Sequence, residues 1–151
     1  MKSKKIIFIL LALLILCPLA HSQKSVDQIF KEFRKEQGVT HIGIGKFTMT
    51  IASIFTDVMG VNGIEVLSFD ECNDSVKERL NKAIASLKDK NYETMVSTND
   101  DGQRTKILVK IEKDAIRELV VLTTGDEAAI VRIKGKINPS DFEKVVNQNK
   151  K

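Results

Sequence analysis

The stretch RELVVLTTGDEAAIVRIK, residues 117–134, decides the fold of this chain. Its first part has a fully apolar centre at 119–122, and residues 129–134 alternate in side-chain character, as strands do. Glycine, aspartate and glutamate at 125–127 form a turn sequence between the two parts. The stretch therefore predicts two antiparallel strands joined by a short turn.

Two further strands are predicted before this stretch. Residues 92–98 form a candidate strand, and in residues 106–112 apolar side chains recur at every second position. The sequence Asn-Asp-Asp-Gly at 99–102 favours a tight turn, because glycine adopts a positive φ without strain. Together with residues 117–134, these segments predict a four-strand antiparallel meander with one face buried and the other in water.

Two amphipathic helices are predicted upstream of the meander. Ser25 begins the first through a capping box with Gln28, and Gly38 is expected to end it. A second capping box begins at Ser75, and this helix is expected to extend to Lys90. Its apolar stripe consists of Val76, Leu80, Ala83, Ile84 and Leu87.

The remaining segments complete the predicted order of elements. Residues 39–46 and 64–69 are expected to be strands, and the densely apolar residues 49–59 a buried helix. A last helix is expected to start at Pro139, capped by Asn138. The sequence therefore predicts an α+β fold, with helices packed on one face of a mainly antiparallel sheet that ends in the meander.

The N-terminus has the three parts of a secretory signal peptide. A basic start at 1–5 precedes an apolar run at 6–16, and Ala20-His21-Ser22 supplies small residues for cleavage after Ser22. The apolar run is shorter than the roughly 20 residues of a membrane-spanning helix, which makes an uncleaved anchor the weaker alternative. We therefore expect a signal peptide at 1–22 and a single domain at 23–151, without a transmembrane span.

Cys17 leaves a second alternative for the site of export. A cysteine that follows an apolar stretch is lipidated in bacterial lipoproteins, but the bulky Leu16 before it departs from that pattern. We therefore predict a periplasmic or extracellular protein and keep an outer-membrane lipoprotein as the alternative.

The charge of the mature chain argues against a nucleic-acid partner. Removal of Lys2, Lys4 and Lys5 with the leader leaves 21 basic and 20 acidic residues. A nearly neutral surface lacks the field that attracts phosphate chains.

No reactive centre is evident in the mature sequence. The thiol of Cys72 lies among Asp70, Glu71 and Asp74, whose negative charges are expected to raise its pKa and disfavour the thiolate. His41 is the only histidine after residue 22, too few for a typical metal site. We therefore predict no catalytic residues, no metal and no cofactor.

Five segments carry a resemblance to a known family: Lys35–Val39, Ile64–Leu67, Tyr92–Met95, Glu118–Leu122 and Ile130–Ile137. In their apolar spacing and order they resemble the secreted bacterial family known as domain of unknown function 4252, typical of Bacteroidetes. The resemblance covers nearly the whole mature chain. It implies an envelope protein, since some members are lipoproteins, with no established activity and no recognised catalytic residues.

Two functional hypotheses follow. The first is a non-catalytic envelope module that binds a protein partner through an exposed sheet face or an open strand edge. The second is a small hydrolase with a site around His41, which the lack of an activated nucleophile disfavours. The candidate partner-binding face consists of Thr105, Lys106, Lys110, Glu112, Arg132 and Lys134.

Overall fold

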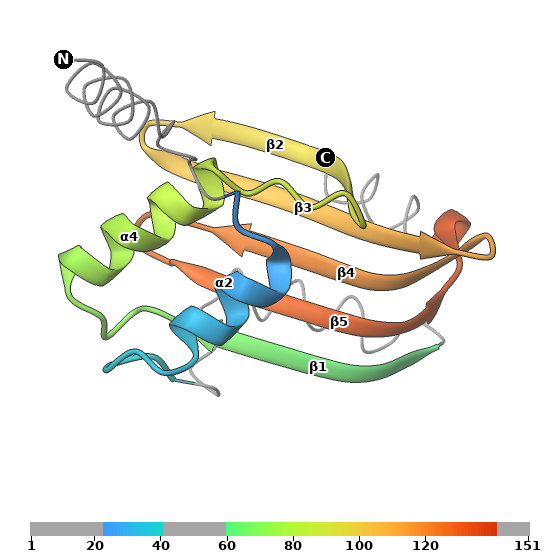
Figure 1. Ribbon diagram of the computed structural model, residues 1–151, viewed down its shortest axis with the longest axis horizontal. Coiled ribbons are helices and arrows are strands. Elements are labelled where there is room, and N and C mark those ends of the chain that lie inside the picture. The colour runs from blue at the N-terminus through green and yellow to red at the C-terminus, as the bar shows by residue number, and fades with distance from the viewer. Residues whose placement is uncertain (1–22, 41–59, 142–151) are drawn as a thin grey trace, which may run out of the picture.

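The computed structural model describes residues 23–40 and 60–141, which form two helices and a five-stranded sheet (Figure 1). The helices are α2 (Val26–Phe33) and α4 (Asp74–Ala85). The strands are β1 (Val61–Ser68), β2 (Glu93–Asp100), β3 (Gln103–Glu112), β4 (Ala115–Thr123) and β5 (Ala129–Ile137). In the described part of the chain, no helix is long and apolar enough to cross a membrane.

All strand pairs of the sheet are antiparallel, in the order β1-β5-β4-β3-β2. The last four strands form the predicted meander, and β1 joins it beside β5. Figure 1 shows α2 and α4 together on one face of this sheet. The predicted α+β class, with helices on one face of an antiparallel sheet, is therefore confirmed.

Helix α2 begins as predicted but ends earlier. Ser25 Oγ accepts a hydrogen bond from the Gln28 N–H, and the Ser25 N–H donates to Gln28 Oε1, which completes the capping box. The helix ends at Phe33 rather than at Gly38. Gly38, with a φ of +87°, instead lies in a turn in which the Val39 N–H donates to the Glu36 carbonyl.

Helix α4 differs from its prediction at both ends. Its N-cap is Asn73, whose Oδ1 accepts from the Val76 N–H at 3.0 Å, so the capping box predicted at Ser75 is wrong. The helix ends at Ala85, and the chain after it contains a turn in which Asp89 accepts from the Asn91 N–H. The predicted apolar stripe is confirmed: Val76, Leu80, Ala83, Ile84 and Leu87 are all buried.

Two-residue turns join β2 to β3 and β3 to β4. Asp101 and Gly102 have φ values of 43° and 82°, the left-handed conformation that such hairpin turns require. Lys113 and Asp114 adopt the same conformation, at 51° and 61°, without a glycine. The second turn therefore lacks the sequence signal that marks the first.

The sheet is buried on both faces along its central strands, contrary to the prediction of one wet face. Alternate residues of β4 belong to two hydrophobic clusters: Val120 and Leu122 pack with α2 and α4, whereas Leu119 and Val121 point to the opposite face. All four side chains are at most 2 % exposed. The unbroken apolar run of this strand reflects burial on both sides, as in parallel sheets.

Several predictions concern residues outside the described ranges. These are the signal peptide at 1–22, the helix at 49–59 and the last helix beyond Asp141. Of the predicted strand at 39–46, the described Thr40 forms an antiparallel bridge to Ser68. At the predicted cap of the last helix, Asn138 Oδ1 accepts from the Ser140 N–H at 3.1 Å.

Candidate functional site

The candidate partner-binding residues do not share one exposed face. Lys106, Lys110, Arg132 and Lys134 lie on the side of α2 and α4, since they alternate with residues of the second cluster. Thr105 points to the opposite side. Glu112, at the end of β3, pairs with Lys110 at 3.3 Å. Partner binding by this set stays a prediction.

Arg132 is buried beneath α2. Its guanidinium lies 4.1 Å from the centre of the Phe30 ring, and Nη2 lies 2.8 Å from Oδ1 of Asp27. The latter contact is an ion pair without the alignment of a hydrogen bond. Through these contacts Arg132 links α2 to the sheet. Only 6 % of the residue is exposed, so it is not accessible to a partner.

Glu118 extends this charged cluster toward Tyr92. The Tyr92 hydroxyl donates to Glu118 Oε2 at 2.7 Å, and Arg132 Nε lies 3.9 Å from the same oxygen. Burial, and then the hydrogen bond to Glu118, raise the pKa of Tyr92 well above its ordinary value. A phenol held neutral in this way is a poor nucleophile.

Cys72 has the environment of an unreactive thiol. It is buried, and its Sγ lies 3.8 Å from the Gln37 carbonyl oxygen. Its pKa is raised as the sequence suggested, although burial contributes more than the neighbouring acids Glu36, Asp70 and Glu71. His41, the centre of the alternative hydrolase hypothesis, lies outside the described residues. Within the described ranges, no three His, Cys, Asp or Glu side chains are grouped as metal ligands.

Strand β2 is the most accessible element of the sheet. It forms one edge, and seven of its eight residues are exposed while Val96 is intermediate. Met95 exposes 48 % of its surface, and no proline interrupts the strand. In Figure 1, β2 follows the margin of the sheet beyond the two helices. Such an edge can receive another strand.

The outward-facing backbone groups of β2 can be assigned from its neighbours. The Arg104 carbonyl accepts from the N–H of Thr124, just after β4, and the Arg104 N–H donates to Thr124 Oγ1, at 2.9 Å each. Both backbone groups of Arg104 therefore face away from its β2 partner Asn99. Asn99 therefore turns its own N–H and C=O away from β3. By alternation, Ser97 also presents these groups outward, whereas Thr98 directs them toward β3.

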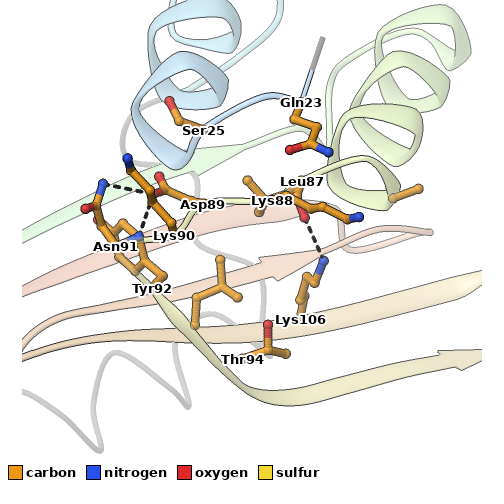
Figure 2. A pocket seen from close by; sticks show the side chains of 12 residues that line it. Gln23, Ser25, Leu87, Lys88, Asp89, Lys90, Asn91, Tyr92, Thr94 and Lys106 are labelled. Atoms are coloured by element: carbon orange, nitrogen blue, oxygen red, sulfur yellow. Dashed lines mark hydrogen bonds between the residues drawn. The ribbon is translucent and has the colours of Figure 1, made fainter. Parts of the chain in front are cut away.

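A groove of about 790 Å³ adjoins the Thr94 end of β2. One wall is the chain between α4 and β2, and the floor is formed by β2 and β3 (Figure 2). Three lysines and one aspartate supply its charged groups: Lys88, Lys90, Lys106 and Asp89. The edge of β2 and this groove together form the candidate binding site.

The sequence missed the loop that forms the groove wall. The predicted helix was extended through Lys90, because Leu87 continues the apolar stripe. The signal that could have placed the helix end earlier is Asp89 followed by Asn91, since both residue types favour turns.

Comparison with known proteins places the chain in a family without a known activity. No curated protein and no solved structure gave a significant match to it. A family model described as a domain of unknown function, DUF4252, matches residues 32–145, which include every described strand and both helices in whole or in part. The predicted family resemblance is therefore confirmed, and the chain belongs to the DUF4252 family.

Proposed function

We propose that this protein is exported and acts in the cell envelope as a non-catalytic module, whose edge strand β2 receives an extended segment of a protein partner. Export is supported by the basic, apolar and small-residue pattern of residues 1–22. Its destination in this proposal is the periplasm or the cell exterior. Partner binding is supported mainly by the exposure of β2 along its whole length.

The chemistry of β2 suits strand addition. An added strand gains affinity from main-chain hydrogen bonds, for which Ser97 and Asn99 offer outward backbone groups. Specificity comes from alternate side chains, and the strand offers the apolar Met95 among hydroxyl residues at 94, 97 and 98. Lysine and proline are the residues that commonly protect an edge strand from pairing. Strand β2 carries neither residue, so it lacks these two obstacles to the addition of a strand.

Site-specific crosslinking in the native envelope tests this proposal. A photo-crosslinking amino acid in place of Ser97, in the full chain, is expected to give one discrete adduct larger than the protein itself. The control position is Lys82, whose side chain is 74 % exposed on α4. No adduct from position 97, or equal adducts from both positions, would contradict the proposal.

Two proline variants identify the contact as strand pairing. Ser97→Pro removes an outward N–H, so it should abolish the adduct formed from a crosslinker at Met95 and leave the melting temperature nearly unchanged. Thr98→Pro removes an N–H that faces β3, so it should lower the melting temperature. Retention of the adduct in a folded Ser97→Pro variant would show that β2 is not extended by a partner strand.

A further inference from the structure

Lys106 is a partly buried cation without a carboxylate partner in the described part of the chain. Its Nζ donates to the Leu87 carbonyl at 3.3 Å, and no ion pair forms there. Burial, followed by the charge of Arg104, lowers the pKa of Lys106, which shows that the surroundings do not compensate its charge. An ammonium in this position gains most from an incoming anion.

The single acid in the groove does not balance its three lysines, and its hydrogen bonds go to other groups. Asp89 Oδ2 accepts from the Val26 N–H at 3.1 Å, and Oδ1 accepts from the Asn91 N–H at 3.0 Å. In the described residues, Lys88 and Lys90 also form no ion pair. Figure 2 shows Lys88 and Lys106 at one end of the groove, near Gln23, with Asn91 at the other end. The groove is therefore cationic.

The groove is continuous with the edge that receives the partner. Thr94 of β2 lines it, and Lys106 is the β3 partner of Ser97, so a strand paired along β2 passes beside the groove. We propose that the groove binds a carboxylate of the partner segment, carried by the residue that pairs with Ser97 and therefore points to the same face of the sheet as Lys106. This inference rests on the proposed function and adds the chemistry of the partner: a peptide with Asp or Glu at that position.

Full-length antiparallel pairing of β2 with a second copy of this chain is electrostatically disfavoured. If β2 paired with its own copy over its whole length in antiparallel register, Glu93 would lie opposite Asp100 of the other copy at both ends. Like charges placed directly opposite each other destabilise strand pairs. Neither acid is neutralised by an ion pair within the described residues, so this repulsion would persist. The charges of the strand therefore favour a different protein as partner.

Selection from a library of random nine-residue peptides tests the inference. Peptides are selected on the full chain purified after export, and the enriched ones are expected to carry Asp or Glu at a fixed position. Lys106→Met should weaken the binding of such a peptide by about tenfold, the loss typical of a charge-assisted hydrogen bond. Lys82→Met on the exposed side of α4 is the matched control and should leave binding unchanged.

A double-mutant cycle assigns the contact to Lys106. Replacement of the peptide's acid by its amide should weaken binding to the unmodified protein by about tenfold and have little further effect on the Lys106→Met variant. If the enriched peptides carry no acidic residue but their binding is reduced by Ser97→Pro, this inference is overturned and the proposed function stands. Absence of enrichment, or enrichment that Ser97→Pro does not reduce, would overturn the proposed function as well.

Discussion

Arg132 shows how one residue can join a helix to a sheet through several kinds of contact. Its guanidinium lies over the Phe30 ring, pairs with Asp27 and approaches Glu118. The alternation of β5 predicted Arg132 on an exposed sheet face, whereas the structure places it on the helix-bearing face. The sequence could not predict that α2 would cover the residue, because that depends on where the helix crosses the sheet.

Tyr92 should make the stability of the protein depend on pH in the alkaline range. Its pKa is raised in the folded protein, by burial and by its hydrogen bond to Glu118, so the unfolded chain releases this proton first. The stabilisation is complete below the ordinary tyrosine pKa of about 10 and is lost as the pH rises above it. Urea denaturation at pH 9 and pH 11 measures this effect. Between the two pH values, the free energy of unfolding should fall more for the unmodified protein than for Tyr92→Phe.

The same titration can be followed directly, since Tyr92 is the only tyrosine of the chain. The absorbance change of tyrosine ionisation should have its midpoint above pH 10 in the folded protein and near pH 10 in urea. At neutral pH, Tyr92→Phe should lower the free energy of unfolding by about 1.5–3 kcal/mol, because it removes a hydrogen bond to a charged group. Equal midpoints in the two states would contradict the buried contact with Glu118.

At the scale of elements, apolar periodicity predicted the buried face of α4 correctly, whereas capping signals misplaced its start. The stripe of α4 is buried as expected because packing against the sheet decides which face turns inward. The start of this helix was misplaced because Asn73 and Ser75 both belong to residue types that cap helices. The turn at Lys113 and Asp114 escaped prediction because the two strands it joins, rather than its own residues, impose the positive φ.

The N-cap of α4 can be tested with two substitutions two residues apart. Asn73→Ala removes the acceptor for the Val76 N–H and should lower the free energy of unfolding by about 1 kcal/mol. Ser75 lies inside the first turn of the helix, so Ser75→Ala should change the free energy of unfolding by less than about 0.5 kcal/mol. Chemical denaturation of both variants provides the measurement, and an equal loss in both would contradict the assignment of Asn73 as the cap.

At the scale of the whole molecule, the meander was predictable but its neighbour was not. The strands β2 to β5 are joined by short turns, so their order follows from the sequence. Strand β1 is separated from β5 by a helix and three strands, and it could have paired at either edge. Its place beside β5 leaves β2 without a second neighbour among the described strands, and the candidate binding site therefore depends on a contact distant in sequence.

The pairing of β1 with β5 requires a close approach of their two backbones, and this close approach can be tested. A Cβ on Gly135 would lie 2.2 Å from the Gly60 carbonyl oxygen and 2.9 Å from the Cα of Val61. Gly135→Ala must therefore push β1 away from β5, and we expect a loss of at least about 3 kcal/mol in the free energy of unfolding.

Gly63→Ala is the matched control on the same strand pair, because a Cβ there would come no nearer than 3.9 Å to Lys134. It should change the free energy of unfolding by less than about 1 kcal/mol, as measured by urea denaturation. If Gly135→Ala is tolerated as well as Gly63→Ala, then β1 does not lie against β5 as described. In that case β1 could lie beside β2, and the edge proposed to receive the partner would not be free.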